Sequence, residues 1–221
     1  MKSVLFRSLV VVLIFFIGSV IGYQLLYGNQ KLPVLGPQNI NPLLVDSSLI
    51  HSSQEHFIGE FNLTNQLGET ITDKTYEGKI YVANFIFTTC PKMCPLMTSN
   101  MKTVYKAFLS DPEVYFLSHS VTPKIDSVPK LFSFAQEYEA KAPQWNIVRG
   151  DKKHIYELAR KHYFAATTQG DGGVNDFIHT ENFVLVDKKK RIRGIYDGTS
   201  FDAIDQLIED IGILKNESDS E

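Results

Sequence analysis

The stretch that decides the fold runs from Ile80 to Pro95 and reads IYVANFIFTTCPKMCP. Its first half, Ile80–Phe87, is an apolar run rich in β-branched and aromatic side chains, which is typical of a strand buried on both faces. Two cysteines, Cys90 and Cys94, follow this run. Beyond them, apolar side chains recur at helical spacing at Met97, Met101, Val104, Tyr105 and Phe108. The sequence therefore predicts a buried strand that passes into a helix at a pair of cysteines.

Strand and helix patterns alternate on either side of this junction. A hairpin is predicted around Gly68, and a second one precedes the final helix. The other predicted strands are Phe57–Leu63, Glu69–Thr72, Val114–Val121, Trp145–Val148, Phe183–Val186 and Ile192–Tyr196. The other predicted helices are Val128–Tyr138, preceded by Asp126 and Ser127 as caps, Lys152–Tyr163, capped by Asp151, and Phe201–Ile213. This order predicts an α/β fold in which helices flank a mixed sheet.

The composition of the 221-residue chain indicates one globular domain with an appendage. A composition of 43% hydrophobic and 21% charged residues excludes a disordered, a collagen-like or a multi-span membrane protein. A formal net charge of −3 argues against a nucleic-acid partner. We expect a membrane anchor or signal over residues 1–30, a linker over 31–54, a folded domain over 55–215 and a polar tail over 216–221.

The first thirty residues predict export of the domain. Ser8–Tyr27 is uncharged and long enough to cross the hydrocarbon core, which takes about 20 apolar residues as a helix. Lys2 and Arg7 precede it, so the positive-inside rule places the N-terminus in the cytosol. A cleaved signal peptide is the alternative. We expect a single-pass protein of the inner (cytoplasmic) membrane with its soluble domain on the extracytoplasmic, periplasmic side, where a dithiol can become a disulfide.

The spacing of Cys90 and Cys94 is suited to chemistry at a helix N-terminus. If they form the first helical turn, positions i and i+4 share one face, so the two sulfurs can meet. The helix N-terminus, with Lys92 nearby, lowers the pKa of a thiol. A disulfide closing so short a loop would stabilise the fold by only about 2 kcal/mol, so a purely structural bridge is the weaker interpretation. A zinc site would lack a second cysteine pair.

His179 is the leading candidate among the six histidines for a further metal ligand. It lies between a glycine-rich loop, Gln169–Gly173, and the predicted strand Phe183–Val186. His119 ends a predicted strand, and we interpret it as a hydrogen-bonded structural residue. His51, His56, His154 and His162 are interpreted as solvated residues of the linker or of a charged helix. The residues alone leave the third ligand open.

Together these features resemble the Sco/SenC family of membrane-anchored, thioredoxin-like copper proteins that serve cytochrome c oxidase assembly. The resemblance covers about residues 55–213 and is carried by TTCPKMCP after a hydrophobic strand and by a lone histidine before a later strand. It implies that Cys90, Cys94 and His179 are the copper ligands. Two departures are Thr122, where the family commonly has Asp before Pro123, and Ile178, where Asp often precedes the ligand histidine. Asp176 is the nearest carboxylate to that second position.

The resemblance implies a copper-binding metallochaperone rather than a turnover enzyme. Its acceptor would be the dinuclear copper site of cytochrome c oxidase subunit II, and it would need a copper donor. Two thiolates and an imidazole suit Cu(I), a soft ion. The alternative is a thiol-disulfide oxidoreductase that uses Cys90 and Cys94 to reduce the acceptor's cysteines. A peroxiredoxin-like peroxidase is a weaker third possibility, because no arginine lies near Cys90 in the sequence.

Overall fold

The computed structural model describes residues 10–19, 22, 30–45, 49, 55–166, 170, 172–173 and 175–218. The chain divides into two compact units, Met1–Lys31 and Leu32–Glu221. In the first unit, residues 10–19 are helical and exposed. Most of the predicted anchor lies outside the described residues, and among those that are described no helix combines the length and apolarity needed to cross a membrane.

The second unit is built on a seven-stranded mixed sheet with the strand order β2-β1-β5-β4-β3-β6-β7. The strands are β1 (Asn62–Asn65), β2 (Thr70–Thr72), β3 (Ile80–Ile86), β4 (Val114–Ser120), β5 (Trp145–Arg149), β6 (Asn182–Val186) and β7 (Ile192–Asp197). The three central strands β3, β4 and β5 are parallel, and the outer pairs are antiparallel. Both predicted hairpins, β1–β2 and β6–β7, are confirmed, but the first strand lies at Asn62–Asn65 and not at the predicted Phe57–Leu63.

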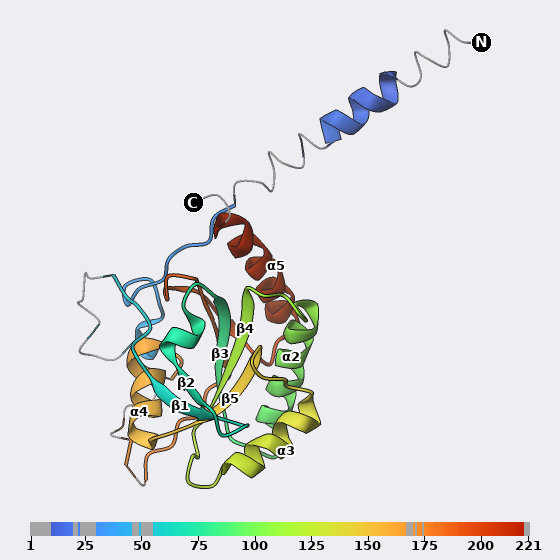
Figure 1. Ribbon diagram of the computed structural model, residues 1–221. Helices are drawn as coiled ribbons and strands as arrows, with labels where there is room; N and C mark the ends of the chain where they lie inside the picture. The colour runs from blue at the N-terminus through green and yellow to red at the C-terminus, as the bar shows by residue number, and fades with distance from the viewer. Residues whose placement is uncertain are drawn as a thin grey trace. The chain divides into compact units, whose positions relative to one another are not determined.

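Helices cover both faces of the sheet (Figure 1). The α-helices are α2 (Met93–Ala107), α3 (Val128–Tyr138), α4 (Lys152–Glu157) and α5 (Phe201–Ser218). Two short 3₁₀ helices, η1 (Pro42–Leu44) and η2 (Asp73–Tyr76), and a π-helical turn, η3 (Leu158–His162), complete the elements. Helices α2, α3 and α5 contribute to one hydrophobic cluster, and α4 with η3 contributes to the other. The predicted α/β architecture is therefore confirmed.

Every side chain of strand β3 is buried, so this strand contributes to both hydrophobic clusters. Ile80, Val82 and Ile86 join the cluster under α2, while the intervening Tyr81, Ala83 and Phe85 join the cluster under α4. Burial of each large apolar side chain stabilises the fold by about 1.5–3 kcal/mol. Strands β3 and β4 end together, with Ile86 opposite Ser120, so the segments that follow them meet at one edge of the sheet.

The helix after β3 begins later than predicted. Cys90 lies outside the helix, and α2 starts at Met93 with Lys92 as its N-cap. Cys90 precedes Pro91, and a residue before proline is disfavoured in the α conformation, which explains the delayed start. Cys94 is therefore the second residue of α2 rather than the end of a first turn that begins at Cys90.

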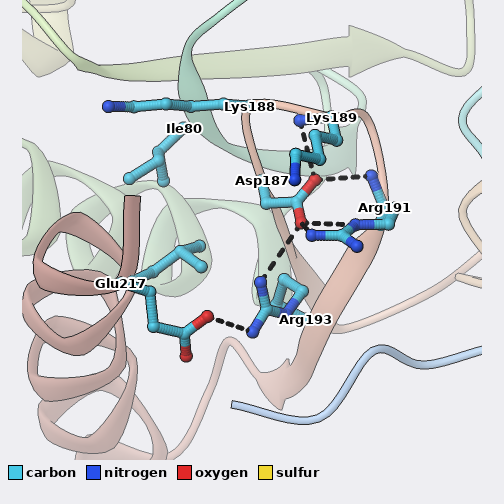
Figure 2. Close-up of a pocket in the computed structure, with 8 residues that line it drawn as sticks. Ile80, Asp187, Lys188, Lys189, Arg191, Arg193 and Glu217 are labelled. Atoms are coloured by element: carbon cyan, nitrogen blue, oxygen red, sulfur yellow. Dashed lines mark hydrogen bonds and ion pairs between the residues drawn. The ribbon is translucent and has the colours of Figure 1, made fainter. Parts of the chain in front are cut away.

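The segments predicted as linker and tail both contact the domain. Leu35 forms a β-bridge with Ile192 on the edge strand β7. Arg193 donates to the carbonyl of Pro33 at 3.1 Å. It also pairs with Glu217 at 2.6 Å and contacts Asp187 at 3.2 Å (Figure 2). Helix α5 consequently continues to Ser218, past the predicted end of the domain, because the buried Arg193 holds its last turn.

Candidate functional site

The two thiols lie next to each other at the start of α2. Both are free and buried, with Cys90 9% and Cys94 4% exposed. The backbone N–H of Cys94 donates to the Cys90 sulfur at 3.4 Å. Cys90 Sγ therefore accepts a hydrogen bond from one of the amides that a helix N-terminus leaves without a partner. A backbone hydrogen bond also stabilises the loop between β3 and α2: the Cys90 N–H donates to the carbonyl of Phe87 at 3.2 Å.

The surroundings shift the pKa values of the two thiols in opposite directions. Burial raises the pKa of Cys90, but the amides of Cys94, Lys92 and Met93 outweigh it, so that the pKa lies below its ordinary value. Burial raises the pKa of Cys94 to about 12, and the neighbouring Cys90 acts in the same direction, while the amide of Phe87 opposes them. Cys90 is therefore the more reactive sulfur of the pair.

We expect Cys90 to be alkylated before Cys94. In the folded, reduced protein, limiting iodoacetamide should modify Cys90 faster by about tenfold or more, because the thiolate is the reacting species. Peptide mass spectrometry of quenched samples measures the two rates. In urea the two rates should converge, and a faster reaction of Cys94 in the folded protein would contradict the assignment.

A buried carboxylate, Asp126, supports the segment that leads to the thiols. It is fully buried and accepts hydrogen bonds from the hydroxyls of Thr88 at 2.5 Å, Ser120 at 2.6 Å and Thr122 at 2.9 Å. Lys130 approaches it at 3.6 Å. Asp126 thus ties the end of β4 to Thr88, two residues before Cys90, and fixes the approach to the dithiol.

This role of Asp126 was not predicted from the sequence, in which the residue was interpreted as a helix cap. The N-cap of α3 is Ser127, without a side-chain cap hydrogen bond. The available signal was a set of hydroxyl residues just past the ends of two adjacent parallel strands. Thr122, which stands where an aspartate was expected, donates to Asp126. A second carboxylate at position 122 would face Asp126 and repel it.

His179 lies near the dithiol segment. Its side chain is exposed, and its ring lies 6.5 Å from the ring of Phe87, which precedes Cys90 by three residues. Phe177 contacts the same ring from 5.1 Å. Across the described ranges, no three His, Cys, Asp or Glu side chains stand close enough to hold a metal ion. The structure thus brings Cys90 and Cys94 together and leaves His179 beside Phe87, without gathering all three.

The remaining histidines are mostly structural. His119 is fully buried, with its Nδ1 3.3 Å from the carbonyl of Asn84, as the structural interpretation predicts. His56 and His162 were expected to be solvated, but they are partly buried: His56 Nε2 lies 2.8 Å from the His162 carbonyl, and His162 Nδ1 accepts from the Gly59 amide at 3.1 Å. Gly59 lies close to the His162 ring, and the His56 ring packs on Phe164 with centroids 4.2 Å apart, which accounts for their partial burial. His51 lies outside the described residues.

A mixed sheet with helices on both faces and a reduced dithiol at a strand-to-helix junction defines a thiol protein of the thioredoxin-like fold. The sequence profile of the SCO1/SenC family matches residues 50–214. The chain therefore belongs to the SCO1/SenC family.

Known relatives agree with this assignment. The SCO1 protein homolog of Bacillus subtilis is 30% identical over 153 residues, which cover 68% of this chain and 79% of the relative. The solved structure of BsSco, described as having a disulfide switch and as a member of the Sco family of cytochrome c oxidase assembly proteins, is 28% identical with a TM-score of 0.62, covering 72% of this chain and 94% of that one. ScoI of Bradyrhizobium japonicum, solved with copper bound, shares the fold at 23% identity and a TM-score of 0.57, covering 72% of this chain and 99% of that one.

Proposed function

We propose that this protein carries copper and delivers it to the dinuclear copper site of cytochrome c oxidase subunit II. The observation that carries the proposal is the pair of reduced, adjacent thiols at the start of α2, beside a segment with an exposed imidazole. Membership of a family that contains oxidase assembly proteins supports the choice of acceptor.

The donor set fits copper as a cargo. Two soft thiolates and an imidazole suit Cu(I), whereas hard cations prefer oxygen ligands. Two thiolates with one Cu(I) carry a net charge of −1, which the amides at the start of α2 stabilise. Cys90 and Cys94 would hold the ion at the start of α2, and His179 would approach from its own segment when copper binds. Metal binding supplies free energy for gathering ligands that stand apart in the free protein.

The arrangement also favours a second function, reduction of the acceptor's disulfide. The low-pKa Cys90 thiolate would attack one sulfur of that disulfide, forming a mixed disulfide and releasing one acceptor thiolate. Cys94, losing its proton, would then attack Cys90 Sγ and release the second acceptor thiolate. The acceptor gains two electrons, and this protein is left with a Cys90–Cys94 disulfide. The geometry of the dithiol alone serves both functions.

We further propose that residues 8–27 anchor the protein in the inner membrane with its N-terminus in the cytosol. Lys2 and Arg7 precede this uncharged stretch, and the folded unit begins at Leu32, shortly after it. The domain would then work on the extracytoplasmic side, where it would receive copper from a donor protein.

Substitution of His179 separates the two functions. We expect His179→Ala to lower the affinity for Cu(II) by about tenfold or more, since loss of an imidazole ligand affects the borderline ion most. Affinity for Cu(I) should fall less, because two thiolates can still hold Cu(I). Competition titrations with Cu(I) and Cu(II) chelators, together with the visible spectrum of the Cu(II) form, measure both effects.

The matched control is His154→Ala, which removes an imidazole from α4. Copper transfer to the isolated copper domain of subunit II should fail or slow in His179→Ala, while reduction of that domain's disulfide should persist. Unchanged Cu(II) bands in His179→Ala would reject the ligand, and disulfide reduction without any copper transfer by the unaltered protein would favour the reductase.

A further inference from the structure

A buried ion pair stands next to the segment that carries His179. Arg160 Nη1 donates to Asp176 Oδ2 and Arg160 Nη2 donates to Asp176 Oδ1, both at 2.7 Å. Each side chain is only 8% exposed. Two parallel charge-assisted hydrogen bonds form a strong and geometrically specific contact. The pair therefore fixes the position of Asp176 relative to the π-helical turn η3, from which Arg160 extends.

Further contacts converge on Asp176. The Gly172 amide donates to Asp176 Oδ2 at 2.7 Å, and Lys152 Nζ donates to the carbonyls of Gly173 and Asp176, each at 2.6 Å. A Cβ on Gly170 would collide with the Asp176 carboxylate. The glycines before His179 thus allow the chain to close around Asp176, and α4 with η3 holds it there.

Side chains alternate along the segment from Asp176 to His179. Asp176 is nearly buried and Ile178 is 1% exposed, whereas Phe177 and His179 are exposed and both contact the ring of Phe87. Because exposure alternates with a period of two along these four residues, a shift by one residue would bury His179 and expose Ile178. The anchor at Asp176 sets which side chains face Phe87.

We propose that Arg160 and Asp176 form a positioning pair that presents the His179 imidazole to the copper held by the two thiols. The inference rests on the proposed role of His179. It assigns Asp176 a place behind the ligand rather than on the metal, because Arg160 engages both carboxylate oxygens. Partners of this kind, which orient a metal ligand without touching the metal, typically change metal affinity by about 10–100-fold when removed.

The proposal is tested by substituting the two residues of the pair. Hydrogen exchange is measured in the metal-free protein, and copper affinity and the visible spectrum are measured in the copper-loaded protein. In the metal-free protein, Asp176→Asn should speed amide hydrogen exchange at residues 177–180 by about tenfold or more. In the loaded protein it should weaken Cu(II) binding by about tenfold and shift the visible bands, with Cu(I) affinity changed by less than about threefold. Arg160→Lys, which keeps the charge but not the paired hydrogen bonds, should give a smaller change of the same sign.

A double-mutant cycle shows whether Asp176 acts through His179. Added to His179→Ala, Asp176→Asn should have no further effect on Cu(II) affinity. Full additivity would overturn the proposal, as would an unaltered Cu(II) spectrum and exchange rate in Asp176→Asn. If His179→Ala itself leaves copper binding unchanged, the ligand assignment of the proposed function has failed. If His179→Ala weakens binding and Asp176→Asn does not, only the positioning pair has failed.

The matched control is Glu157→Gln, which removes the exposed pair between Lys161 and Glu157 at 3.4 Å on the same stretch of helix. It should change neither copper binding nor hydrogen exchange at residues 177–180. If Asp176→Asn does not fold, Gly170→Ala displaces the Asp176 carboxylate through a steric contact and leaves the charges in place. The same spectral change in Gly170→Ala is expected, and an unchanged spectrum in that folded variant would overturn the proposal.

Discussion

Cys90→Ser and Cys94→Ser are each expected to abolish stoichiometric copper binding while leaving the domain folded. A serine hydroxyl is a hard, neutral donor, so the single remaining thiolate cannot hold Cu(I) against a competing thiol in solution. Both cysteines belong to the same hydrophobic cluster, and a serine side chain has nearly the same shape as a cysteine side chain. The unfolding free energy should therefore fall by only about 1–2 kcal/mol, the cost of burying an imperfectly paired hydroxyl.

Copper content after dialysis against a thiol and urea unfolding of each variant measure the two parts of this expectation. The matched control is Met93→Leu, which removes a sulfur atom from the residue just before Cys94 and should leave binding intact. One copper per chain in either serine variant would refute the role of the dithiol. If both serine variants are unfolded, Cys90→Ala and Cys94→Ala, which add no polar group, decide whether the thiols bind copper.

His119 is expected to make the stability of the domain strongly dependent on pH. Burial lowers the pKa of His119 from 6.5 to about 4, and the carbonyl of Asn84 opposes this only in part. Nδ1 faces that carbonyl, so it carries the proton of the neutral ring, and Nε2 has no hydrogen-bond partner within the described chain. The ring stacks on Phe85, with the two ring centroids 4.8 Å apart. Protonation therefore favours the unfolded state.

The direction of the pH dependence of stability follows from the lowered pKa of His119. Below pH 6.5 the unfolded chain binds a proton on His119 that the folded protein binds only near pH 4. The stability associated with the neutral ring is complete above pH 6.5 and is lost as the pH falls toward 4. At about 1.4 kcal/mol per pKa unit, the loss is about 3 kcal/mol.

Urea unfolding of the unaltered protein and of His119→Phe isolates this contribution. Other groups titrate over the same range in both proteins, so the difference between their unfolding free energies should change by about 3 kcal/mol between about pH 7 and about pH 4. Parallel pH profiles would show that the ring is not the responsible group. His119→Leu provides a second non-titrating variant if phenylalanine does not fit the site.

Elements with strong local signals were predictable from the sequence. Helix α3 has the predicted bounds, since Pro129 favours its start and Glu139 ends it in a left-handed conformation with φ of 61°. Strand β3 was predicted to within one residue, because a fully buried parallel strand leaves a continuous apolar run. The closeness of the two cysteines after β3 was also predicted, although Cys90 lies in the loop before α2 and not in a first helical turn.

Features that depend on distant contacts were not predictable. The last turn of α5 and the docking of residues 32–35 depend on Arg193, which reaches both from β7. The role of Asp126 depends on hydroxyls from two other segments, and that of Asp176 depends on Arg160 in η3. From the sequence alone, a charged residue is expected at the protein surface or at a helix cap. Its buried partners become evident only from the fold.

The most direct test of the account is copper K-edge X-ray absorption of the purified, reduced protein loaded with one equivalent of Cu(I). We predict two sulfur scatterers from Cys90 and Cys94 and one imidazole nitrogen from His179, with the nitrogen lost in His179→Ala. A first shell without sulfur, or one that is identical in the Cys90→Ser and Cys94→Ser variants, would contradict it.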